Sequence, residues 1–364
     1  MKRQPTDMRS NLSNPDRTSH PMIVRRVAYV AAALSVGALL AGLRVPAGWL
    51  IGAIVTGLVC SVLVKKMQLP DWLFKVSLGV IGANIGFILK PTQFVEYHQL
   101  LLPFLLTLCL TLAGGVLLGR FMHRFSGLDA NTAFFCCLPG GASEAIALSK
   151  EYGANQSIVA AYHTTRILFF VLTIPVVAGI SRSGSGSFGI NGSWGTAVVS
   201  TGLLALSVLA AVLLARRLKF PGSLLLFSIL IGFVASSLVP EAEIPRFVPG
   251  IGQGLLGAVI GLRFDNQTMT QLKKIGATAL ISLLLYFVLS VLLATIFYGL
   301  TPLDWFTSLL SVVPAGAAEM SSTAMALDIE PALVATLQMA RLLAVFFAMP
   351  LLIHRFVRRV EAPK

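Results

Sequence analysis

Two pairs of charged residues stand out in a chain that is otherwise strongly apolar. Glu144 and Arg166 lie in its first half, and Glu319 and Arg341 lie in its second half. A charged side chain at the centre of a bilayer costs about 2.5–3.5 kcal/mol on insertion scales, so each needs a compensating interaction or a role. A carboxylate and a guanidinium in such a place can bind a solute or a proton, or they can neutralise the ends of helices. The sequence alone leaves both interpretations open.

The glutamates belong to two similar strings, LPGGASEAIALSKEYG (138–153) and VPAGAAEMSSTAMALD (313–328). Each string has a proline and glycine in the middle of an apolar segment, where proline removes a backbone donor and glycine permits a sharp bend. We therefore expect the helix to break there and a short helix to follow, whose N-terminal N–H groups and dipole favour an anion. The candidate substrate-binding positions at these breaks are Pro139, Gly140, Gly141, Pro314 and Gly316.

The arginines lie on the long segment that follows each string. A turn at the end of the string would bring the two segments side by side, with glutamate and arginine at depths about 6 Å apart for a rise of about 1.5 Å per residue. Long side chains can cover that difference. We therefore predict that Glu144 pairs with Arg166 and Glu319 with Arg341, or that they pair across the two halves.

Two further polar residues are candidates for the same site. His163 lies one helical turn before Arg166, and the residue at the matching position in the second half is Gln338. A lone histidine on an apolar helix is typically a packing residue, with titration during function as the alternative. Asn84, within the segment GVIGANIGF, could line a cavity. Both are retained as candidate substrate-binding residues.

An internal duplication places these residues. Each of the pairs Pro139 and Pro314, Glu144 and Glu319, and Arg166 and Arg341 is separated by 175 residues, and the same offset joins further prolines and glycines without a gap. A single offset that links residues of these types indicates a tandem repeat. The expected organisation is a cytoplasmic flexible tail (1–26), membrane repeat 1 (27–180), a Gly/Ser-rich linker (181–195), membrane repeat 2 (196–355) and a short cytoplasmic tail (356–364).

Each repeat contains six apolar segments. In the first they are 27–43, 46–64, 72–89, 97–119, 131–152 and 156–180, and in the second 196–215, 221–239, 247–263, 275–299, 305–327 and 332–353. Several are long enough to span a bilayer, and the chain is 56% hydrophobic but only 12% charged, about half the charge of a soluble domain. We therefore expect an all-α polytopic membrane protein.

The distribution of Lys and Arg predicts the topology. The net charge of +13 is more typical of basic cytoplasmic loops in a membrane protein than of nucleic-acid binding. If all twelve segments crossed, many basic residues of the second repeat would face outward. If the fifth segment of each repeat instead enters and leaves on one side, the repeats are inverted, and both termini are cytoplasmic. We predict about ten crossings plus two re-entrant or broken segments, which leaves few basic residues outside: Arg44, Lys90, Arg182 and Arg246.

At the level of motifs, the chain resembles a known bacterial family. The duplicated PGGASE…R…P and PAGAAE…R…P strings, with the RVPAGWLIGA segment (44–53), resemble the membrane AbrB family, whose members carry an "AbrB duplication" domain. The resemblance covers nearly all of residues 27–355 and implies a bacterial inner-membrane protein. Two labels accompany the family, regulation of gene expression and ammonia monooxygenase. The name is shared with a soluble DNA-binding regulator that this chain does not resemble.

The residues support these labels unequally. A monooxygenase needs clustered metal ligands, but the histidines are scattered and the cysteines show no Cys-x-x-Cys spacing, so we expect no enzyme, no cofactor and no metal site. No nucleic-acid recognition module is recognisable, so any effect on gene expression would be indirect. We expect a transporter or sensor whose partners are membrane lipid and an unknown small solute, with a homo-oligomer left open. The alternative is a non-transporting membrane regulator that acts through a protein partner.

Overall fold

The computed structural model describes residues 19–64, 67–90, 97–179, 194–239, 244–245 and 247–356. In this part of the chain every regular element is a helix, and seven helices are long and apolar enough to cross a membrane. Three further apolar helices of 16 or 17 residues accompany them. The protein is therefore an all-α polytopic membrane protein, which confirms the expected fold class at this level.

The helices of the two repeats follow one another in the same order. Those of the first are α1 (Ser19–Gly42), α2 (Gly48–Leu63), α3 (Asp71–Ile88), η1 (Tyr97–Leu100), α5 (Leu101–Ser126), α6 (Ala130–Cys137), α7 (Ala142–Glu151) and α8 (Gln156–Gly179). Those of the second are α9 (Trp194–Arg217), α10 (Ser223–Leu238), α11 (Phe247–Arg263), α12 (Asn266–Ile275), α13 (Ala277–Leu300), α14 (Trp305–Val312), α15 (Ala317–Ala326) and α16 (Pro331–Phe356). The starts of α6, α7 and α8 precede those of α14, α15 and α16 by 175 residues, the offset read from the sequence.

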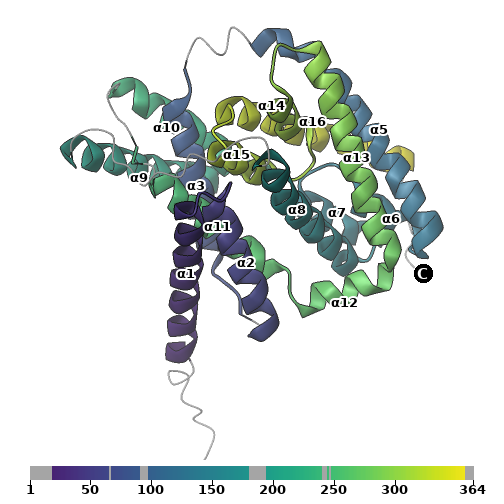
Figure 1. Cartoon of the computed structure of the whole chain (residues 1–364). Helices are drawn as coiled ribbons and strands as arrows, with labels where there is room; N and C mark the ends of the chain where they lie inside the picture. The colour runs from purple at the N-terminus through teal and green to yellow at the C-terminus, as the bar shows by residue number, and fades with distance from the viewer. Residues whose placement is uncertain are drawn as a thin grey trace, which may run out of the picture.

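Six helices from both repeats form one bundle, which we call the glycine bundle: α1, α2, α3, α9, α10 and α11 (Figure 1). Its central contacts use glycine because the backbones nearly touch. A Cβ on Gly57 of α2 would lie 2.7 Å from the Cα of Gly261 on α11, and a Cβ on Gly86 of α3 would lie 2.9 Å from the carbonyl carbon of Gly232 on α10. These glycines therefore mark close helix packing.

The remaining long helices and the broken ones form a second unit, the hairpin bundle: α5, α6, α7, α8, α13, α14, α15 and α16 (Figure 1). In the first repeat, α6 and α7 are separated by the Pro139 break and fold back on each other. Asn131 Nδ2 donates to the carbonyl oxygen of Tyr152 at 2.9 Å, and the Asn155 N–H donates to Thr132 Oγ1 at 2.8 Å. The start of α6 thus lies beside the end of α7, so the pair returns to the side from which it came.

The second repeat has the same break. Helix α14 ends at Val312 and α15 begins at Ala317, with Gly316 at φ 107°, a backbone conformation that only glycine adopts readily. The predicted breaks at both proline–glycine strings are therefore confirmed.

Two details differ from the sequence prediction. Helix α1 begins at Ser19, inside the segment assigned to the flexible tail (1–26), because its apolar stretch is preceded by residues that still permit helix. Helix α12 was not expected; it is polar on one face, follows an N-cap at Asp265 and is bent by 59° from α11. The linker (181–195) and the final tail (356–364) lie almost wholly outside the described residues.

Candidate functional site at the two hairpins

Each arginine binds the end of a broken helix. Arg166, only 2% exposed, donates from Nη1 to the carbonyl oxygen of Leu138 at 3.0 Å. Arg341 donates from Nη1 to the equivalent carbonyl, that of Val313, and to that of Val312 at 3.1 Å. These carbonyls belong to the C-terminal ends of α6 and α14, which have no partner within the helix and carry the negative end of its dipole. The guanidinium groups therefore cap and neutralise the first half of each hairpin.

A second side chain completes each cap. His163 Nε2 lies 2.9 Å from the carbonyl oxygen of Phe135, and His163 Nδ1 lies 3.0 Å from Arg166 Nη2. Because a carbonyl can only accept and a guanidinium can only donate, the ring carries its proton on Nε2 and is neutral. Gln338 forms the same two bonds in the second repeat: its Nε2 donates to Leu310 O and its Oε1 accepts from Arg341. Since an amide replaces the imidazole bond for bond, the packing role of His163 is favoured over titration.

The glutamates occupy the opposite helix ends. The Glu144 carboxylate folds back over Gly141, and the Glu319 carboxylate folds back over Gly316, so closely that a Cβ at either glycine would collide with it. Each carboxylate therefore lies at the N-terminal end of its own helix, α7 or α15, where free N–H groups and the positive end of the dipole favour an anion. Glu319 is 6% exposed, whereas Glu144 is partly exposed.

The structure does not contain the predicted pairs of glutamate with arginine. Within the described residues, no ion pair joins either glutamate to either arginine, in one repeat or across the two. The physical reason is that each charge already has a partner of opposite sign in a helix end. The arginine takes the carbonyl end before the break, and the glutamate takes the N–H end after it. Spacing along a helix predicts how deep a side chain lies but not which neighbouring group it meets.

The site contains a tyrosine that sequence reasoning missed. The Tyr286 hydroxyl on α13 donates to the carbonyl oxygen of Cys137 at 2.6 Å, and its ring centroid lies 5.5 Å from the Arg166 guanidinium carbon. Its position in the first repeat is held by Thr111, so the duplication gave no signal for it.

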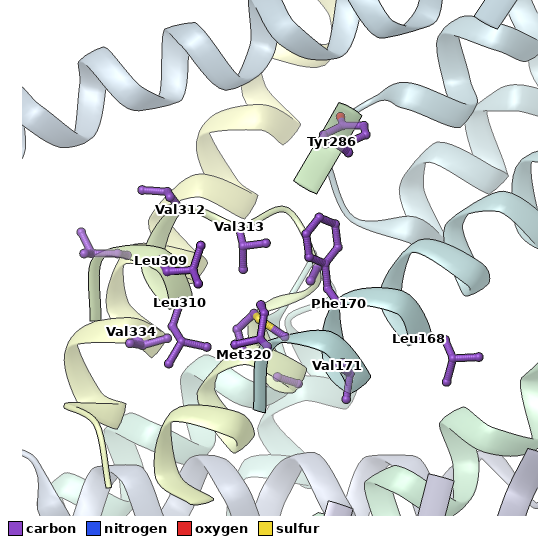
Figure 2. Packing of buried hydrophobic residues seen from close by; sticks show 14 of the residues in the cluster. Leu168, Phe170, Val171, Tyr286, Leu309, Leu310, Val312, Val313, Met320 and Val334 are labelled. Atoms are coloured by element: carbon purple, nitrogen blue, oxygen red, sulfur yellow. The ribbon is translucent and has the colours of Figure 1, made fainter. Parts of the chain in front are cut away.

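Apolar side chains fill the space between the two hairpins. Figure 2 shows Phe170 of α8 together with Tyr286, Val313 and Met320, all of which are buried in one continuous core. The predicted site residues at the breaks therefore lie around a packed apolar centre.

Asn84 takes part in a contact between the two bundles. It is 4% exposed, and its Nδ2 lies 3.3 Å from Met325 Sδ on α15. Nearby, Gln253 Nε2 on α11 donates to the carbonyl oxygen of Ser322 at 3.4 Å. Asn84 was expected to line a cavity. Instead α15 packs directly over Asn84, which does not line the cavity described next.

That cavity, of about 810 Å³, lies between the first repeat's hairpin and the ends of the glycine bundle. Its wall comprises the end of α2 and the start of α3, Ile146 of α7, one face of α8, the end of α11 and helix α12. None of the predicted site residues lines it. The polar side chains that line the cavity include those of Gln156, Ser157, Thr164, Arg263 and Gln271.

The matching positions on α15 and α16 are buried. Ile146, Ala160 and Thr164 face the cavity, and their counterparts are Ser321, Ala335 and Met339, which are 0%, 0% and 3% exposed. Among the described residues, the two halves therefore differ in solvent access: the contact between bundles is open beside α7 and α8, and closed at these three positions of α15 and α16.

These features define a class of protein: a polytopic helical membrane protein built from a duplicated unit, each copy with a broken-helix hairpin capped by its own Arg and Glu. The family model described as "Transition state regulatory protein AbrB" matches residues 5–87 and 49–357. The chain belongs to this AbrB family, in its membrane form, as the motifs suggested.

Two relatives align over nearly their whole length. A protein of Escherichia coli (strain K12), named AbrB and described as a candidate regulator, is 28% identical over 339 residues, which cover 91% of this chain and 95% of the relative. The protein YhjN of Bacillus subtilis (strain 168) is 27% identical over 353 residues, which cover 88% of this chain and 90% of the relative.

Proposed function

We propose that this AbrB-family protein is a carrier or sensor of a small polar solute in the bacterial inner membrane, with both termini in the cytoplasm. The observation that carries the proposal is the cavity between the two bundles beside α7 and α8, where the matching positions on α15 and α16 are buried. Any effect on gene expression then follows from the solute, and the protein itself catalyses no reaction.

An inverted arrangement of the two repeats supports this proposal. Thr278 Oγ1 donates to the carbonyl oxygen of Phe125 at 3.0 Å, and Gly114 meets Leu289, so α5 and its counterpart α13 run antiparallel. Leu289 is itself the counterpart of Gly114, which puts this contact on the axis that relates the repeats. Equivalent helices that run in opposite directions across such an axis belong to repeats turned over in the membrane.

The directions in the glycine bundle agree with that arrangement. Leu50 meets Gly257 and Gly57 meets Gly261, so α2 runs parallel to α11 rather than to its own counterpart α10. Five crossings in each copy, with hairpins that return to their own side, give this pattern. These directions support the proposed ten crossings, in which the cavity lies on the basic, cytoplasmic side beside Lys273 and Lys274 of α12.

In an inverted repeat, the open contact on one side and the closed contact on the other occupy structurally equivalent places. Movement of the hairpin bundle against the glycine bundle can therefore open one as it closes the other, which is the alternating access used by carriers of this architecture. Closing would bring Ile146 and Thr164 against the end of α11. Opening would separate Asn84 from Met325.

Cysteine labelling tests the proposal. In a variant without native cysteines, Thr164→Cys should react with an impermeant maleimide from the cytoplasmic face of membrane vesicles. Met339→Cys should react only from the opposite face, and more slowly, because its side is closed in this structure. Val288→Cys on the exposed face of α13 is the control for non-specific labelling. Reaction of Met339→Cys from the cytoplasmic face, or from neither face during a time in which Thr164→Cys is fully modified, contradicts alternating access.

The second candidate function is a membrane regulator that acts through a protein partner. The names given to the family and to the E. coli relative favour it. Deletion of residues 1–18, which leaves α1 intact, separates the two functions. A carrier should retain solute uptake without this segment, whereas a regulator that binds its partner through the tail should lose its effect on gene expression while the labelling pattern stays intact.

A further inference from the structure

Arg263 presents an unpaired cation to the cavity. It is the last residue of α11, it is exposed, and its guanidinium carbon lies 4.6 Å from the centroid of the Phe74 ring. Within the described residues it forms no ion pair, although Asp71 and Asp265 also line the cavity. Stacking on an aromatic face restrains a guanidinium but leaves the N–H groups at its edge free to bind an anion in two-point contact.

The same cavity holds hydrogen-bonding groups that lack partners. The Gln271 Oε1 of α12 is buried and accepts no hydrogen bond in the described part of the protein. Thr164, partly buried on α8, likewise has no hydrogen bond there through its hydroxyl. A buried acceptor without a donor is unfavourable and therefore points to a donor that arrives with a ligand.

The two aspartates restrict the charge of such a ligand. Asp265 is already the N-cap of α12, where its Oδ1 accepts from the Thr268 N–H at 2.9 Å, and Asp71 is the first residue of α3. Two carboxylates beside one guanidinium disfavour dianions such as dicarboxylates and phosphate, and leave the guanidinium as the place where a single carboxylate, free or part of a zwitterion, can bind.

We propose that this cavity binds a compact 2-hydroxy- or 2-amino-carboxylate. Its carboxylate pairs with Arg263, and its hydroxyl or amino group donates to Gln271 Oε1. The volume of about 810 Å³ falls within the range of about 300–1,000 Å³ that is usual for small-molecule sites, with room for solvent around so small a solute. This assignment rests on the proposed carrier or sensor function and names the class of solute for it.

Thermal stability of the purified full-length protein tests the proposal with defined probes. L-lactate and L-serine represent the class; propionate lacks the donor, ethanolamine lacks the carboxylate, and succinate and phosphate are dianions. Lactate or serine should raise the apparent melting temperature, since a ligand that binds only the folded state stabilises it. The other four probes should not do so at the same concentration.

Variants assign the effect to the two groups. Arg263→Gln and Gln271→Leu should each weaken the stabilising probe by about tenfold or more, the effect expected for loss of a hydrogen bond to a charged or buried group. Arg124→Gln at the exposed end of α5 is the matched control and should leave binding unchanged. Each variant must first melt cooperatively without ligand, so that misfolding is recognised.

Three results overturn the proposal: no stabilisation of the wild type by lactate or serine, equal stabilisation by succinate or phosphate, or full binding in Arg263→Gln. In each case the cysteine labelling pattern tests separately whether the protein is a carrier with alternating access. If Thr164→Cys and Met339→Cys still label from opposite faces, the solute class is wrong and alternating access stands. If they do not, the proposed function fails as well.

Discussion

Replacement of His163 separates a structural histidine from a titrating one. In this protein Gln338 performs, bond for bond, the task of His163: one N–H for a main-chain carbonyl and one acceptor for the arginine a turn later. His163→Gln should therefore fold, insert and function like the wild type. His163→Leu has a similar volume but offers neither group, so it tests the hydrogen bonds alone.

The expected loss in His163→Leu follows from the groups left without partners. The carbonyl of Phe135 loses its donor, and Arg166 Nη2 loses its acceptor, in a place where both are fully enclosed. A buried polar group without a partner costs about 1–3 kcal/mol, so the pair of losses should destabilise the folded protein by about 2–6 kcal/mol. Arg166 is the more sensitive of the two, because its Nε already lacks a partner.

The assay combines thermal melting of the purified proteins in detergent with solute uptake at several pH values. The uptake is measured between about pH 5.5 and 8, a range that includes the pKa of a free histidine, about 6.5. The glutamine variant should match the wild type in melting temperature and in the pH profile, whereas the leucine variant should melt earlier. The reasoning is refuted if His163→Gln folds with normal stability but loses uptake or changes its pH profile. That result would return His163 to the role of a proton-transferring group.

Three further predictions concern the bundles and the contact between them. Gly57→Ala should destabilise the protein by about 1–3 kcal/mol, because the new methyl group would lie 2.7 Å from the backbone of α11. Gly202→Ala is the control and should be neutral, since no atom lies within 4 Å of the added methyl group. Expression level and melting temperature measure the effect of both variants. Tyr286→Phe should lower stability by about 1 kcal/mol through loss of a single hydrogen bond, and retention of full stability would show that this bond contributes nothing. A disulfide between Asn84→Cys and Met325→Cys should stop uptake and release it on reduction; uptake that continues with the disulfide formed would mean that this contact does not open.

Much of the fold follows from local sequence signals. The tandem repeat, the long apolar helices and the breaks at Pro139 and Pro314 were all predicted, because proline, glycine and apolar length act within a few residues of where they stand. Helix α12 escaped prediction because its polar face gives it low overall hydrophobicity between two obvious membrane segments. Its Asp265 N-cap, three residues before Thr268, was the available signal.

The sequence singles out the charged residues and the breaks of the two hairpins, but not their contacts. Spacing along a helix predicts depth alone. It does not reveal that a broken helix offers two charged ends of its own, which then take the arginine and the glutamate separately. Contacts such as that of Tyr286 with Cys137 O, or of Asn84 with Met325, join positions more than 140 residues apart, and no local pattern encodes them.

Because the duplicated arginines and glutamates already bind helix ends, we expect other residues to recognise a solute. The two repeats share their Arg, Glu, Pro and Gly because each repeat has to bend one helix and to cap both of the helix ends that result. What only one repeat supplies is different: Thr164 where the other has Met339, and Arg263 where the other has Ile88. Under the proposed function, a single solute needs one set of contacts rather than two, so we expect its recognition to belong to these unmatched residues. In that proposal the duplicated motif provides the moving frame, and the cavity beside α7 and α8 provides the selectivity.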